Sequence, residues 1–69
     1  MNIGTAVRVH RAKKDLKRCE LAEVAGIAKH TLESIEYGRH NTSMVTFCAL
    51  AEGMGMRPWE LMKEAEQYD

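Results

Sequence analysis

The chain has 69 residues, of which 45% are hydrophobic and 29% charged, a composition that argues against disorder and against more than one domain. We therefore expect residues 1–69 to form a single domain around one hydrophobic core. The formal net charge is zero, yet residues 1–41 carry a net charge of +3 and residues 42–69 a net charge of −3. Because a polyanion responds to the local field, this asymmetry is compatible with a nucleic-acid partner.

Several other classes of protein are disfavoured by the same composition. No apolar run approaches the roughly 18 residues that cross a bilayer, so we expect a cytoplasmic protein without membrane contact. Cys19 and Cys48 are too few for a disulfide framework, and with the three histidines they lack metal-ligand spacing, so we expect no metal. The sequence shows no nucleophile with a base and no phosphate loop, and we expect neither an enzyme, nor a cofactor, nor a small-molecule ligand.

The first predicted helix covers residues 3–14. Ile3, Val7 and His10 recur at the spacing of one helical face, and the last turn is basic, which suits the negative end of a helix dipole. Asp15 follows at a position where we expect left-handed backbone, which aspartate tolerates better than most residues, and Leu16 then anchors the turn.

Two short helices with a glycine between them follow, over residues 18–25 and 29–37. Gly26 is predicted to end the first of them in a left-handed cap, and Ala22 is small enough for a close approach of the two helices. Leu32 and Ile35 form the only inward stripe of the second helix, which leaves its other faces free. This pattern over residues 17–37 predicts a helix-turn-helix.

The last two predicted helices complete an all-α fold of five helices. The fourth begins after Thr42 or Ser43, either of which suits an N-cap, and ends before Gly55. The fifth begins at Arg57 and Pro58, and we expect residues 65–69 to fray. The fourth helix is predicted to bury its apolar residues Met44, Phe47, Leu50, Ala51 and Met54.

The segment "LAEVAGI" (21–27) followed by "ESIEYGRHN" (33–41) resembles the phage-repressor and Cro-type helix-turn-helix family, also called the xenobiotic-response-element family. The resemblance covers about residues 3–62. It implies a five-helix, lambda-repressor-like domain. Members are typically dimeric DNA-binding transcription regulators of bacteria, phages and plasmids, and short stand-alone members include restriction-modification controller proteins.

The sequence departs from the family pattern at the helix starts. Lys17 and Arg18 stand where members usually carry serine or threonine and then glutamine, which favours phosphate contact at this point. Ala28 replaces the usual serine or threonine cap of the third helix, a loss of roughly 1 kcal/mol.

The resemblance also implies roles for individual residues in DNA binding. Lysine and histidine both donate to the N7 and O6 acceptors of guanine, so we expect guanine in the operator half-site. The residues expected to face base edges are Lys29, His30, Thr31 and Ser34. Those expected to contact phosphates on either side of the groove are Lys17, Arg18, Tyr37, Arg39 and Asn41.

Charged side chains near the motif have structural alternatives. The resemblance implies that Arg11 and Glu36 form an ion pair between the first and third helices, and direct DNA contact is the alternative for Arg11. Glu33 is interpreted as solvated or paired with Lys29, with acceptance from cytosine N4 as the alternative.

Trp59 lies early in the fifth helix, at a position that need not be buried within one chain. An exposed tryptophan is unfavourable unless a partner covers it, so we expect dimerisation through Trp59 and Met62. His10 is interpreted as a partly buried core residue, and the methionines as core filler.

Taken together, these features favour a nucleoid-associated, sequence-specific regulator that binds double-stranded DNA as a homodimer on an inverted-repeat operator. Repression would follow from occlusion of a promoter, and a controller acting through RNA polymerase would use acidic residues such as Glu52 and Glu60. The alternative is an antitoxin or protein-interaction module built on the same helix-turn-helix body.

Overall fold

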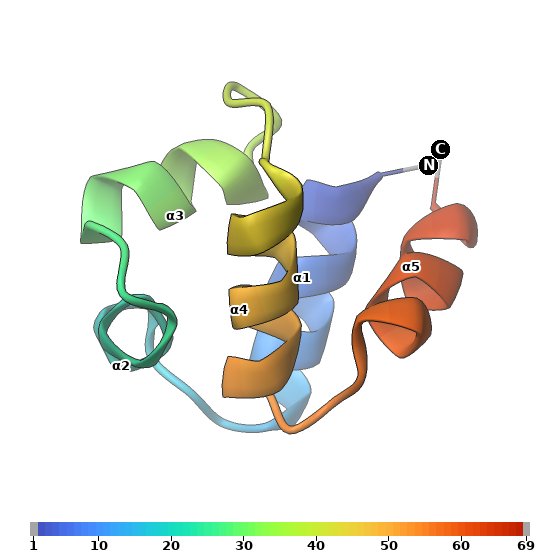
Figure 1. The fold of residues 1–69 in the computed structure, drawn as a ribbon, viewed down its shortest axis with the longest axis horizontal. Helices are drawn as coiled ribbons and strands as arrows, with labels where there is room; N and C mark the ends of the chain where they lie inside the picture. The colour runs from blue at the N-terminus through green and yellow to red at the C-terminus, as the bar shows by residue number, and fades with distance from the viewer. Residues whose placement is uncertain (1, 69) are drawn as a thin grey trace.

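The computed structural model describes residues 2–68, which fold into five helices with no strand (Figure 1). This confirms the predicted all-α class, and the bounds agree to within one or two residues, with Lys14 and Tyr37 serving as C-caps rather than helical residues. Within this range no helix has the length and apolar character needed to cross a membrane. The helices are α1 (Ile3–Lys13), α2 (Arg18–Ala25), α3 (Lys29–Glu36), α4 (Met44–Gly53) and α5 (Pro58–Glu66).

Local side-chain and backbone chemistry sets the helix ends. The Asn2 side chain caps α1 by accepting the Thr5 N–H at 3.0 Å, and Ser43, rather than Thr42, caps α4. After α1, Asp15 adopts the expected left-handed conformation with φ of 56°. The chain therefore turns at the points where short-range patterns predict a turn.

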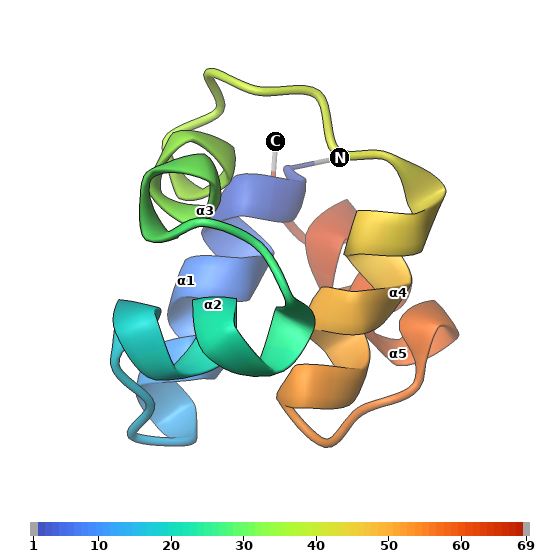
Figure 2. The same ribbon diagram turned by 60° about the vertical axis from the view of Figure 1, so that its left-hand side comes forward.

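The five helices share one core in which α4 packs against both α2 and α5. The two views show α3 on one side of the molecule and α5 on the other, with α1 between them (Figures 1 and 2). α1 contacts both α3 and α5. The fully buried apolar side chains come from every helix and include Val7, Leu21, Leu32, Leu50 and Leu61.

Gly4 allows α1 to approach the end of α3 unusually closely. A Cβ atom at this position would lie 2.3 Å from the Ile35 carbonyl oxygen and 2.8 Å from that of Glu36. Because both neighbours are backbone atoms, no side-chain rotation could relieve the clash. The missing side chain therefore fixes the distance between α1 and the last turn of α3.

One burial prediction is wrong. Met44, predicted to lie in the core, is 64% exposed and is the first residue of α4. Of the two cysteines, Cys19 is exposed and Cys48 is half-buried. Met44 and Cys19 therefore belong to the surface of the domain.

The end of α5 packs against the rest of the domain. Ala65 is fully buried, and its carbonyl oxygen accepts the Asn2 N–H at 2.9 Å, which joins the end of α5 to the start of α1. Tyr68 packs against the core. The expected fraying of residues 65–69 stays a prediction, and Asp69 lies outside the described residues.

Candidate nucleic-acid interface

The turn between α2 and α3 is built on Gly26. Its φ of 73° lies in the left-handed region, and the following Ile27 N–H donates to the Ala22 carbonyl at 3.0 Å. This closes the end of α2 and redirects the chain within three residues. α3 then packs against α2 and α1 through one stripe of its surface.

α3 presents most of its polar residues outward. Its buried residues are Leu32, Ile35 and Glu36, so the stripe that docks it is narrow. The four residues predicted to face base edges all lie on this helix. Lys29 and His30 are exposed, and Thr31 and Ser34 are partly exposed.

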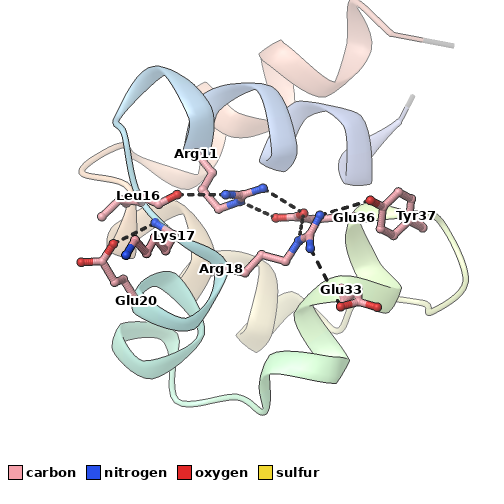
Figure 3. A network of polar contacts seen from close by, with 8 residues as sticks. All are labelled: Arg11, Leu16, Lys17, Arg18, Glu20, Glu33, Glu36 and Tyr37. Carbon is pink, nitrogen blue, oxygen red and sulfur yellow. Dashed lines mark hydrogen bonds and ion pairs between the residues drawn. The ribbon is translucent and has the colours of Figure 1, made fainter.

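A buried carboxylate joins three helices. Glu36 is 2% exposed, and its Oε2 accepts the Arg11 Nε–H at 2.8 Å (Figure 3). Its Oε1 accepts Arg18 Nε–H at 2.8 Å and Arg11 Nη2 at 3.3 Å. Arg11 also donates to the Leu16 carbonyl at 2.9 Å, which ties the α1–α2 turn to the same group.

The expected ion pair between Arg11 and Glu36 is therefore present. The pair holds α1 to the end of α3, and through Leu16 it also fixes where α2 begins. Among residues 2–68, Glu36 is the one charged residue that is buried. A carboxylate can be buried only if its charge is compensated, and here guanidinium groups compensate it.

Arg18 has a structural role that the sequence did not indicate. Besides its bond to Glu36, its Nη2 donates to the Tyr37 hydroxyl at 3.1 Å. The Glu36 carboxylate raises the pKa of Arg18 above its usual value, chiefly through their hydrogen bond. Two of its nitrogens are thus used within the protein, and a phosphate would meet a guanidinium already held in place. No local spacing relates Arg18 to Glu36, so only the tertiary structure reveals the pair.

Glu33 pairs differently from the expectation. Its Oε2 lies 3.9 Å from Arg18 Nη1, at the outer edge of the same network, while about half of its side chain is exposed. The interpretation as a solvated carboxylate therefore agrees with the structure, and Arg18 rather than Lys29 is the cation recorded beside it.

The structure brings several basic side chains together at the starts of α2 and α3. An open hollow of about 360 Å³ is lined by Arg11, Lys17, Arg18, Cys19 and Lys29. The predicted phosphate residues Lys17 and Arg18 therefore lie beside Lys29, a predicted base-contacting residue. α2 starts here because the Glu20 carboxylate accepts the Lys17 N–H at 2.8 Å.

The remaining predicted phosphate residues lie at the other end of α3. Gly38 has a φ of 72°, and the Arg39 N–H donates to the Ser34 carbonyl at 2.8 Å, which caps α3. Arg39 and Asn41 are exposed in the loop that follows, and Tyr37 is 50% exposed. Predicted contacts with phosphate thus lie at both ends of the exposed face of α3.

The predicted dimer residues lie on the side of the molecule away from α3. Trp59 is 65% exposed, as expected, whereas Met62 is partly buried against the core. Both line an apolar hollow of about 330 Å³ together with Met44, Phe47 and Pro58. The exposed Met44 therefore belongs to the same surface as Trp59.

Comparison with known proteins agrees with the helix-turn-helix geometry described above. No family model matches the sequence. An uncharacterized HTH-type transcriptional regulator of Methanothermobacter thermautotrophicus is 33% identical over 51 residues, which is 74% of each chain.

Two solved structures share the fold. The restriction-modification controller protein C.AhdI from Aeromonas hydrophila superposes with a TM-score of 0.84 at 30% identity, over 87% of this chain and 91% of that one. The clp gene regulator ClgR from Corynebacterium glutamicum gives a TM-score of 0.92 at 27% identity, over 96% of this chain and 70% of that one. With the exposed α3 held by the Glu36 network, these relationships show that the chain belongs to the HTH-type transcriptional regulators.

Proposed function

We propose that this protein is a sequence-specific regulator that places α3 in the major groove of double-stranded DNA. The observation that supports this most directly is the outward face of α3, where Lys29 and His30 are exposed while a single stripe docks the helix. A helix held in this way can enter a groove without unfolding from the body. Lys29, His30, Thr31 and Ser34 are the proposed base-contacting residues.

Phosphate contacts at both ends of α3 would set its depth and register in the groove. Lys17 and Arg18 line the basic hollow at the start of α3, and Arg39 and Asn41 lie exposed beyond its end, next to Tyr37. Contacts of this kind position a protein without reading sequence. Specificity would come from Lys29 and His30, for which guanine N7 and O6 are suitable acceptors.

The same proposal includes a homodimer formed through α5. Trp59 and Met44 are 65% and 64% exposed, and they border one apolar hollow. Covering these side chains with a second copy would remove a large apolar area from water, and a tryptophan alone can bury roughly 150–250 Å². A twofold axis at α5 would present two copies of α3 to two half-sites of an inverted repeat.

Sedimentation equilibrium of Trp59→Ala tests the dimer. The matched control is Val24→Ala, which also truncates an exposed apolar side chain, on α2. We expect the Trp59 variant to shift toward monomer and the Val24 variant to keep the wild-type association. An unchanged dimer in Trp59→Ala would exclude this surface as the interface.

We infer repression by occlusion of a promoter as the mode of action. Of the two acidic residues considered for a polymerase contact, Glu60 accepts the Arg57 N–H at 2.8 Å and so already serves to start α5. Glu52 is exposed and is the residue on which a controller acting through RNA polymerase would depend.

Selection from a random duplex pool with the purified protein tests DNA recognition. We expect an enriched inverted repeat, and a loss of affinity in Lys29→Ala or His30→Ala of about 5- to 150-fold, since a good base contact is worth about 1–3 kcal/mol. Lys13→Ala, an exposed lysine at the end of α1, removes the same charge as Lys29→Ala and serves as the control.

The outcome also separates the two classes of function. Binding that is weak, steeply salt-dependent and indifferent to sequence would contradict the proposal. It would favour the alternative, an antitoxin or protein-interaction module that uses the same fold to bind another protein.

A further inference from the structure

Three guanidinium groups surround the ring of Tyr37. The Cζ atoms of Arg8, Arg18 and Arg39 lie 5.7, 5.5 and 5.8 Å from the ring centroid, within the range of cation–π contact. They come from α1, from the start of α2 and from the loop after α3. Because the Tyr37 side chain is itself 50% exposed, this cluster lies at the surface.

The charges of this cluster are not balanced. Arg18 is paired with Glu36 and lies 3.9 Å from Glu33, but no ion pair formed between residues 2 and 68 includes Arg8 or Arg39. Cations gathered around one ring repel each other, and each cation–π contact at an exposed site offsets only about 0.5–1 kcal/mol. An anion at this point would relieve the repulsion.

The hydroxyl group of Tyr37 can still donate a hydrogen bond. Its oxygen already accepts a hydrogen bond from Arg18 Nη2 at 3.1 Å (Figure 3). A phenol has one proton to donate, and with its oxygen engaged in this way the proton remains for an outside group. A phosphodiester oxygen is an acceptor that carries negative charge, so it matches both the hydroxyl and the unpaired guanidinium groups.

We propose that Arg8, Tyr37 and Arg39 form a binding site for a DNA backbone phosphate, with Arg8 of α1 as a contact outside the helix-turn-helix. The inference rests on the proposed DNA-binding function. α3 has eight residues and so is about 12 Å long, which is about the width of the major groove. Lys29 at its start and Tyr37 at its C-cap are thus separated by about that width.

Gly4 and Glu36 hold the two sides of this site together. Gly4 brings α1 against the carbonyl groups of Ile35 and Glu36, one helical turn before Arg8. Glu36 positions Arg18, which in turn holds the Tyr37 hydroxyl. The site is therefore preorganised by buried contacts, although Tyr37 and Arg39 are exposed.

The salt dependence of DNA binding tests this site. Affinity of Arg8→Gln is measured on the selected operator and on a random-sequence duplex of equal length, each at several salt concentrations. One lost phosphate contact lowers the magnitude of the slope of log K against log salt by about 0.9. We expect this reduction on both duplexes, with a similar loss of affinity on each, because a phosphate contact carries no sequence information.

Arg57→Gln is the matched control, since Arg57 is an exposed arginine at the start of α5. We expect it to keep the wild-type slope. Tyr37→Phe keeps the ring and removes the hydroxyl, and we expect a severalfold loss of affinity with little change in slope because no charge is lost. Thermal denaturation of each variant identifies effects that come from the fold.

Two results would overturn the inference. If the wild-type protein binds the operator and Arg8→Gln retains the slope and affinity of Arg57→Gln, the cluster stabilises α3 without contacting DNA, and the proposed function stands. If the wild-type protein binds neither duplex, the proposed function fails and this site fails with it.

Discussion

Glu36→Gln is the substitution that most directly tests how α3 is held. The buried Glu36 carboxylate accepts hydrogen bonds from Arg11 and Arg18, which come from two other helices. Glutamine has nearly the same shape but only one acceptor oxygen, and its amide nitrogen would face guanidinium donors. The substitution therefore removes the charge while leaving the packing almost unchanged.

The expected loss of stability follows from burial. Removing one partner of a buried ion pair typically costs about 3–5 kcal/mol, because the other charge is left uncompensated. The Arg11 side chain is 15% exposed, so water can solvate part of its guanidinium group after the substitution. We therefore expect the lower end of this range, about 3 kcal/mol. For a domain of this size that corresponds to a fall in Tm of at least about 12 °C.

Thermal and urea denaturation followed by circular dichroism measures this loss. Protein concentration must be fixed, because association would add to the apparent stability. Glu33→Gln is the control, since it removes the same charge from the same helix at a side chain that is 49% exposed. We expect it to cost less than about 1 kcal/mol. The reasoning is refuted if Glu36→Gln is no less stable than Glu33→Gln.

Three further substitutions test the helix contacts and caps by the same denaturation measurement. Gly4→Ala should destabilise by about 1–3 kcal/mol, because its Cβ would meet backbone at 2.3 Å. The control substitution Gly53→Ala should cost much less stability, since the Cβ there meets a flexible leucine methyl at 2.9 Å. Equal losses of stability in the two variants would contradict the argument. Ala28→Ser should stabilise α3 by about 0.5–1 kcal/mol because the backbone already has N-cap geometry, and a loss would show that the hydroxyl is misplaced. Ser43→Ala should cost about 1 kcal/mol through loss of the α4 cap, and no change would mean that water replaces it.

Local chemistry made the helices predictable. The left-handed residues Asp15, Gly26 and Gly38 end three helices, and each of these ends depends on residues close in sequence. The apolar spacing likewise identifies Leu32 and Ile35 as the docking stripe of α3. The exposed face that carries Lys29 and His30 follows from the same periodicity, so the fold and the proposed base-contacting surface could be predicted.

Burial at the edge of the core was less predictable. Met44 has the spacing of a core residue on α4, yet it is 64% exposed at the first position of that helix and borders the hollow beside Trp59. Periodicity gives the direction in which a side chain points along a helix. Periodicity does not predict how far the neighbouring helices extend along the side that faces the core.

The amino-acid sequence alone is enough to predict the five helices and the turn at Gly26. It also predicts that the basic residues 1–41, rather than the acidic residues 42–69, attract a polyanion. Two other features emerge only from packing: Arg18 shares Glu36 with Arg11, and Arg8 lies beside Tyr37. The physical reason is distance along the chain. Helix ends and faces depend on residues within about one or two turns, whereas these pairs form only when packing brings α1 and the start of α2 against the end of α3.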